Sequence, residues 1–284
     1  MEHTTIQTNG VNLHVVQAGK PDAPLMILLH GFPDFWYGWR HQIEALADAG
    51  LWVWAPDQRG YNLSDKPPNA TDYGLDTLAT DVIGLIDAAG RDTCLLVGHD
   101  WGGAVAWWTA NRFPERLQKL AIINTPHHSV FRRTLSKSWA QKSRSAYMMT
   151  VRIPRLPEWA LSRFNWWYLS RALRRSANPG TFDAEELDQY RAAWSQPGAM
   201  TAILNWYRAI GKTQTERPPS RRITVPTMLI WGERDKFFVP GMGQQSIEMC
   251  DDGRLESIPD GTHWVAAEQA ETVNRHLIEF LTPQ

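Results

Sequence analysis

Composition and charge limit what this chain can be. Its 284 residues are enough for one large domain or a domain with an insertion. The formal net charge of −1 argues against nucleic acid and against a strongly charged substrate as partners. The two cysteines exclude a disulfide framework, and the polar N-terminus and the lack of any run of transmembrane length predict a cytoplasmic protein without a membrane partner.

Strand and helix patterns alternate through residues 1–125. The first two strand patterns flank Asn9-Gly10, a strong hairpin signal. Further apolar strand patterns cover 24–31, 51–60, 94–97 and 117–124, and helical patterns cover 39–50, 77–90 and 104–110. Repeated β-α units predict an α/β fold with a doubly wound, mostly parallel sheet covered by helices on both faces.

The alternation stops after Pro126 and resumes at 224–232, with a final strand at 254–258 and a last helix that places Val273, Leu277 and Leu281 on one face. We therefore expect a core of 1–125 and 219–284 and an inserted helical cap of 126–218. The cap has fifteen Lys or Arg and six Asp or Glu. A basic cap could steer anions or touch acidic surfaces, but a solvated face is the simpler interpretation, because the arginines are scattered. The cap is also a candidate contact surface in a homodimer.

The segment "LLVGHDWGG" (95–103) carries the main chemical signal. Gly98-His99-Asp100-Trp101-Gly102 has the spacing of a G-x-S-x-G nucleophile turn between strand and helix, with Asp100 in place of serine. The glycines permit a turn that is too sharp for side chains. A helix N-cap is the plain alternative for Asp100, but an N-cap needs no flanking glycines. The pattern favours a nucleophilic carboxylate.

Other polar loops follow the ends of the predicted strands, where sites form in open parallel sheets. "HGFPDFW" (30–36) follows the third strand, "WGERDKF" (231–237) follows the strand after the insertion, and "PDGTHW" (259–264) follows the last one. The chain order is thus Asp100, Asp235 and His263, or nucleophile, acid and base. Glu233 is the alternative acid, disfavoured by its spacing from the strand end.

A carboxylate nucleophile selects the substrate. Asp100 is ionised near neutral pH, so it can attack a tetrahedral carbon and form an alkyl ester. Water activated by His263, which Asp235 orients, then hydrolyses that ester. The backbone N–H groups of Phe32 and Trp101 are candidates for the oxyanion hole. The substrate is therefore expected to be an epoxide or an alkyl halide, and the scheme needs neither metal nor cofactor.

Four motifs, "HGFPDFWYGWR", "DQRGYNLSDKP", "GHDWGG" and "GTHW", resemble those of the epoxide hydrolases of the α/β-hydrolase superfamily, and the similarity extends over essentially the whole chain. The resemblance implies two cap tyrosines that donate hydrogen bonds to the epoxide oxygen. "LNWYR" (204–208) nominates Tyr207, which could also be a core tyrosine of an amphipathic helix. Tyr147 stands at the matching place for the first, with Tyr168 and Tyr190 as alternatives.

We therefore predict an epoxide hydrolase that converts a small apolar epoxide to a vicinal diol. The chain has 15 tryptophans, which favours an aromatic pocket, although core packing explains many of them. We expect the pocket to include Trp36, His99, Trp206 and Trp264.

Two other functions stay open. A haloalkane dehalogenase would use the same triad, and Trp101 could serve as a halide donor, but position 32 is Phe rather than Asn. A fluoroacetate-type dehalogenase is disfavoured, because Trp101 stands where that type has arginine. The second alternative is a binding protein that keeps the fold without turnover.

Overall fold

The computed structural model describes residues 1–213 and 220–282. Its sheet has eight strands in the order β1-β2-β4-β3-β5-β6-β7-β8. The strands are β1 (Glu2–Thr8), β2 (Val11–Ala18), β3 (Leu25–Leu29), β4 (Trp52–Pro56), β5 (Cys94–His99), β6 (Leu117–Ile123), β7 (Thr227–Gly232) and β8 (Gly253–Ile258). The pairings of β2 with β1 and β4 are antiparallel and all others are parallel, so the predicted mostly parallel sheet is confirmed.

The predicted hairpin forms at Asn9-Gly10. Thr8 pairs with Val11 across a two-residue turn. Asn9 and Gly10 have φ of 44° and 75°, the positive values that this tight turn requires. The turn fixes the register of β1 against β2.

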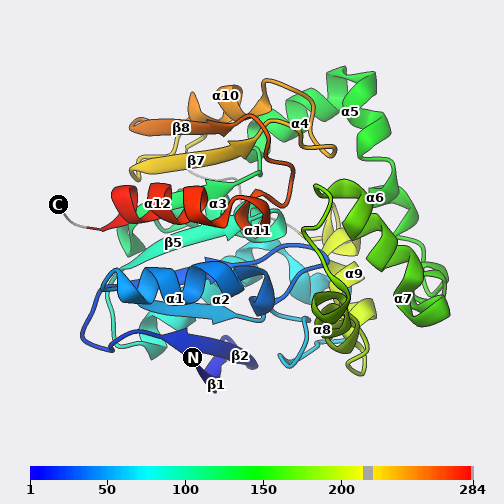
Figure 1. Cartoon of the computed structure of the whole chain (residues 1–284), viewed down its shortest axis with the longest axis horizontal. Helices are drawn as coiled ribbons and strands as arrows, with labels where there is room; N and C mark the ends of the chain where they lie inside the picture. The colour runs from blue at the N-terminus through cyan, green and yellow to red at the C-terminus, as the bar shows by residue number, and fades with distance from the viewer. Residues whose placement is uncertain (214–219, 283–284) are drawn as a thin grey trace.

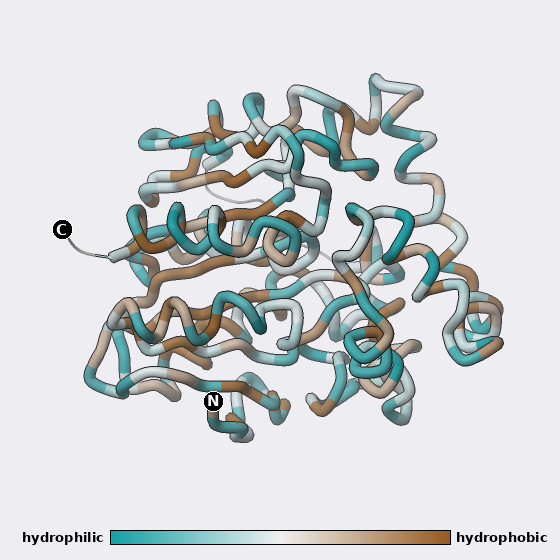
Figure 2. The backbone as a smooth tube through the Cα atoms, in the orientation of Figure 1, coloured by the Kyte–Doolittle hydropathy of each residue, from teal (hydrophilic) through white to brown (hydrophobic). Residues whose placement is uncertain are grey.

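Helices cover both faces of the sheet. Along β3, Leu25, Ile27 and Leu29 face one hydrophobic cluster, and Met26 and Leu28 face another. The first cluster packs against α2 (Leu75–Ala88), α3 (Trp101–Arg112) and α10 (Met242–Ile247), and the second against α1 (Arg40–Asp48), α11 (Val265–Glu268) and α12 (Ala270–Leu281). Figure 1 shows α1 and α12 on the near face, and Figure 2 shows hydrophobic residues along the central strands. Burial on both faces explains why these strands are apolar runs rather than alternating patterns.

Apart from loops and an isolated β-bridge at Ile223, the described residues between β6 and β7 form helices. They are α4 (His128–Lys137), α5 (Trp139–Arg144), α6 (Tyr147–Thr150), α7 (Leu156–Ser176), α8 (Ala184–Trp194) and α9 (Ala199–Ala209). They lie together at one edge of the sheet (Figure 1). A third hydrophobic cluster joins α7, α8 and α9 to the loop after β3 through Phe35 and to the loop after β8 through Trp264. The expected end of the cap at residue 218 lies outside the described residues.

Short 3₁₀ helices complete the connections: η1 (Trp36–Trp39), η2 (Ala70–Tyr73) and η3 (Pro114–Arg116). Among the described residues, none of the helices has both the length and the apolar character needed to cross a membrane.

Candidate active site

Asp100 lies at a strained turn between β5 and α3. Its φ of 50° and ψ of −120° are unfavourable for a residue with a side chain. The flanking glycines are required by space, since a Cβ on Gly98 would lie 2.4 Å from the carbonyl oxygen of Gly102. A Cβ on Gly102 would lie 2.1 Å from the carbonyl oxygen of Leu29. The sequence thus folds into a turn that presents one carboxylate above the edge of the sheet.

The two carboxylate oxygens of Asp100 have different surroundings. The backbone N–H of Phe32 donates to Oδ1 at 2.8 Å, and Oδ2 lies 3.5 Å from Nε2 of His263. Burial raises the pKa of Asp100, but the imidazole of His263 and the Phe32 N–H more than offset it, so the net shift is downward. The carboxylate is therefore ionised at neutral pH.

His263 lies between two carboxylates. Its Nδ1 is 2.7 Å from Oδ2 of Asp235, and its Nε2 faces Asp100. Burial lowers the pKa of His263, but the two negative charges outweigh burial and raise it to about 10. The imidazole is thus positively charged at neutral pH in this arrangement.

Asp235 is held by four donors. His263 Nδ1–H and the side-chain amide of Asn124 both donate to Oδ2 at 2.7 Å. The backbone N–H groups of Phe237 and Phe238 donate to Oδ1 at 2.7 and 3.3 Å. Glu233, the alternative acid, is exposed, whereas Asp235 is buried. The structure therefore brings Asp235, and not Glu233, to His263.

Tyr207 and Tyr147 face the same cavity as Asp100. Tyr207, on α9, is buried, and Tyr147 begins α6, with their ring centroids 6.1 Å apart. Burial raises the pKa of both phenols, so each keeps its proton at neutral pH. Of the alternatives, Tyr168 is exposed on α7 and Tyr190 packs against Phe35. Neither is among the described residues that line the cavity.

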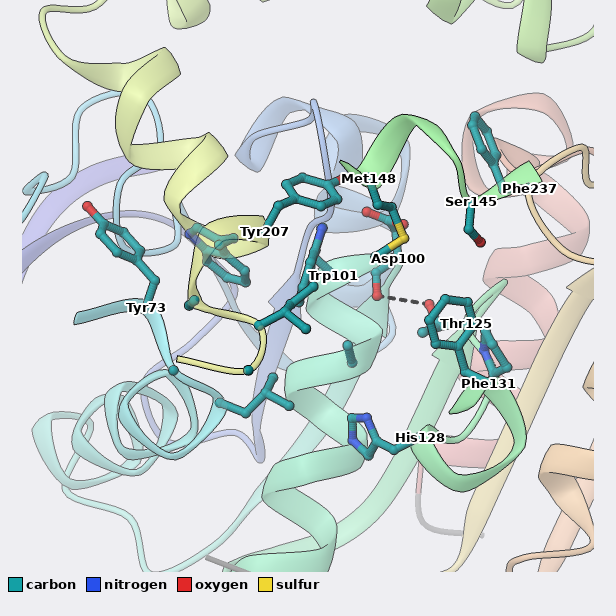
Figure 3. A pocket seen from close by; sticks show the side chains of 18 of the residues that line it. Tyr73, Asp100, Trp101, Thr125, His128, Phe131, Ser145, Met148, Tyr207 and Phe237 are labelled. Carbon is teal, nitrogen blue, oxygen red and sulfur yellow. Dashed lines mark hydrogen bonds between the residues drawn. The ribbon is translucent and has the colours of Figure 1, made fainter. Parts of the chain in front are cut away.

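The cavity has a volume of about 330 Å³. Figure 3 shows Tyr207, Trp101 and Met148 around Asp100, with Phe131 and His128 further along the wall. Most of its wall is aromatic or aliphatic, and the polar side chains are few. Such a cavity suits a small apolar molecule that has one reactive polar group.

Comparison with known proteins agrees with this geometry. The family described as the alpha/beta hydrolase fold matches residues 24–270. "AB hydrolase superfamily protein YfhM" of Bacillus subtilis (strain 168) is 44% identical over 98% of this chain and 97% of its own length. Epoxide hydrolase 4 of Mus musculus is 37% identical over 98% of this chain and 79% of its own length. A Bacillus megaterium epoxide hydrolase in complex with an inhibitor superposes with a TM-score of 0.88 at 31% identity, covering 98% of this chain and 99% of that one.

The chain belongs to the epoxide hydrolase family of the α/β-hydrolase superfamily. Among the described residues, no group of three or more His, Cys, Asp or Glu side chains is arranged to hold a metal ion.

Three of the aromatic residues expected at the pocket do not line this cavity. His99 lies behind His263, with its Nε2 2.8 Å from the His263 carbonyl oxygen. Trp264 donates its indole N–H to Ser176 at 2.8 Å inside the third cluster. The ring of Trp36 packs edge-on against His3 at 5.2 Å. Of the four residues expected there, only Trp206 lines the cavity.

Sequence reasoning missed two residues beside the acid and the nucleophile. Asn124 donates to Asp235 and accepts from the backbone N–H of Gly232 at 2.8 Å. Thr125 donates its hydroxyl to the backbone carbonyl of Asp100 at 3.0 Å (Figure 3). Both directly follow β6, so their place at the carboxyl end of a central strand was the available signal.

Proposed function

We propose that this protein hydrolyses an epoxide to a vicinal diol through an alkyl ester on Asp100. The observation that carries the proposal is the pair of protonated phenols, Tyr147 and Tyr207, on the wall of the cavity that holds the ionised Asp100. A nucleophile and two hydrogen-bond donors on one small cavity match what opening an epoxide requires.

In the first step, Asp100 attacks a ring carbon. The Phe32 N–H already holds Oδ1, so Oδ2 is the attacking atom. A bond forms between Oδ2 and the carbon, the carbon–oxygen bond of the ring breaks, and the oxygen takes a proton from Tyr147 or Tyr207. An alkoxide is a poor leaving group, which is why donors are needed here.

Ester formation removes the negative charge of Asp100 and thereby changes His263. The Asp100 charge is one of the two that raise the His263 pKa, so that pKa falls when the ester forms. His263 then releases its proton, which restores the tyrosine through the solvent of the cavity. The neutral imidazole is now able to act as a base.

In the second step, His263 takes a proton from water and the resulting hydroxide adds to the carbonyl carbon of the ester. The negative oxygen that forms is Oδ1, which already accepts from the Phe32 N–H. The second donor in this proposal is the free backbone N–H of Trp101 in the first turn of α3. Collapse breaks the bond between the carbonyl carbon and the alkyl oxygen Oδ2, which takes the proton of the newly added hydroxyl and leaves as the second hydroxyl of the diol. Asp100 is regenerated as a carboxylate with one oxygen from water, and His263 is again protonated, as before the reaction. The net reaction consumes one epoxide and one water.

The test is to trap the ester. His263→Gln should be alkylated but should not release product, and intact-protein mass spectrometry should find an added mass of one substrate, which peptide mapping places on Asp100. Asp100→Asn is the matched control and should stay unmodified. A His263→Gln enzyme that binds the epoxide and stays unmodified would contradict the two-step scheme and favour the binding-protein alternative.

Assaying the protein against a panel of haloalkanes and a panel of epoxides tests the haloalkane dehalogenase alternative. Release of halide, with no turnover of any epoxide, would assign the same triad to dehalogenation.

A further inference from the structure

The outer side of the cap carries a row of exposed hydrophobic residues. Along α7 they stand three or four positions apart on either side of a break in the helix, and the most exposed is Phe164, at 76%. We call this row the α7 face; its apolar members are Leu156, Trp159, Phe164, Trp167 and Tyr168. The opposite side of α7 is buried in the third cluster through Trp166, Leu169 and Leu173. α7 therefore has hydrophobic residues on its exposed side as well as on the side that packs in the third cluster.

The backbone of α7 is broken at Phe164, the most exposed residue of the α7 face. Phe164, Asn165 and Trp166 have φ of 52°, 52° and 61°, so three consecutive residues with side chains adopt the left-handed conformation. This conformation is costly for such residues. The break turns Trp166 inward while Phe164 stays outside. Phe164 thus combines an unfavourable backbone conformation with an exposed aromatic ring.

The α7 segment itself is almost entirely positive, whereas α8, which packs against it, carries Glu185, Glu186 and Asp188. Between residues 152 and 175 there are six arginines and a single carboxylate, Glu158. That carboxylate is paired with Arg208 at 2.8 Å. Two of the arginines lie over exposed tryptophans, Arg163 over Trp159 and Arg171 over Trp167, at 4.9 and 5.3 Å from the ring centroids. The face therefore combines aromatic rings with guanidinium groups.

The segment that precedes the α7 face is hydrogen-bonded to residues of α9 and to Ile210, beside the cavity. Ile153, just before α7, accepts a hydrogen bond from Arg208 through its carbonyl oxygen at 2.8 Å, and Arg152 donates to the carbonyl of Ile210 at 2.9 Å. Ile210 lines the cavity and is partly exposed. Figure 1 shows α7 on the outer side of the cap, away from the sheet.

We propose that the α7 face docks on the surface of an anionic phospholipid bilayer. Trp, Tyr and Phe are favoured at the level of lipid headgroups, and arginine binds phosphate while its stem lies along apolar groups. A second copy of this chain fits less well, because a two-fold contact through this face brings the arginines of both copies together. The expected absence of a membrane partner rested on the lack of a spanning run, whereas surface docking needs none.

Docking is tested by flotation of the purified full-length protein with vesicles. We expect binding to phosphatidylcholine vesicles that contain about 30% phosphatidylserine and little binding to phosphatidylcholine alone. Arg171→Gln and Arg175→Gln should each lower the partition coefficient of the protein between water and the anionic vesicles about fivefold. Trp159→Ala with Trp167→Ala should lower it at least about tenfold. Circular dichroism should show that these surface variants fold as the parent does.

Trp139→Ala is the matched control, because Trp139 is 81% exposed and has its own cation partner, Lys142, but lies on α5. It should bind vesicles as the parent does. Failure of the parent to bind anionic vesicles, or equal losses in the control and the α7 variants, would overturn the proposal. Concentration-dependent dimerisation in sedimentation velocity that the α7 substitutions abolish would instead assign the face to a second copy. None of these outcomes depends on epoxide turnover.

Discussion

Replacing Asp235 by Asn tests the function of the acid at the level of single hydrogen bonds. Among the described residues, the donors to Oδ1 are the backbone N–H groups of Phe237 and Phe238, so the asparagine must place its oxygen there. Its NH₂ group then faces Nδ1 of His263, where the aspartate has an accepting oxygen. His263 can satisfy that donor only as the tautomer whose Nδ1 accepts and whose Nε2 carries the hydrogen.

That tautomer cannot take a proton from water at Nε2. The substitution also removes one of the two charges that raise the His263 pKa. We expect hydrolysis of the ester to fall about 10³- to 10⁴-fold, on the order of 4–5 kcal/mol in activation free energy, as for the wrong tautomer in other triads. Alkylation of Asp100 needs no base and should change far less.

The assay is a single turnover of one epoxide, quenched at intervals, with mass spectrometry of the intact protein to follow the ester as it forms and decays. The Asp235→Asn enzyme should accumulate the ester, and Glu233→Gln, at an exposed position, should behave as the parent does. The reasoning fails if Asp235→Asn slows both steps equally, or if Glu233→Gln is the more damaging change.

Three further predictions follow from the same geometry. Tyr147→Phe and Tyr207→Phe should each slow alkylation by an epoxide about 10- to 1000-fold and together nearly abolish it, with Tyr168→Phe as the control; a parental rate in Tyr207→Phe would contradict the pairing. Folding raises the pKa of His263 from 6.5 to about 10, so the protonated imidazole stabilises the folded state. This contribution to the free energy of unfolding is complete below pH 6.5 and is lost as pH rises through 10. In the parent, the free energy of unfolding measured with urea should fall by several kcal/mol over that pH range, and His263→Gln should remove this fall. Parallel curves of unfolding free energy against pH for the two proteins would refute this. Gly98→Ala, whose Cβ would lie 2.4 Å from the Gly102 carbonyl oxygen, should lower the free energy of unfolding by about 1–3 kcal/mol, and an unchanged midpoint would show that the turn relaxes.

The sequence by itself determined the elements that depend on local pattern. Continuous apolar runs mark strands buried on both faces, and Asn9-Gly10 marks a turn that needs two positive φ values. It also determined which loops lie together, because Asp100, Asp235 and His263 all come shortly after the ends of strands that run parallel. Parallel strands end at one edge of a sheet, so position along the chain becomes position in space.

The tertiary structure alone decided which aromatic residues meet the cavity. Trp36, Trp206 and Trp264 are equally aromatic in the sequence, yet only Trp206 lines the cavity, because side-chain direction follows from packing against distant segments. The same reason separates Tyr147 from Tyr168, which differ in the face of the cap that they occupy. The raised His263 pKa likewise needs two carboxylates that lie 163 and 28 residues away in the chain and a few ångströms away in space. Such contacts depend on how the elements pack, which no local pattern encodes.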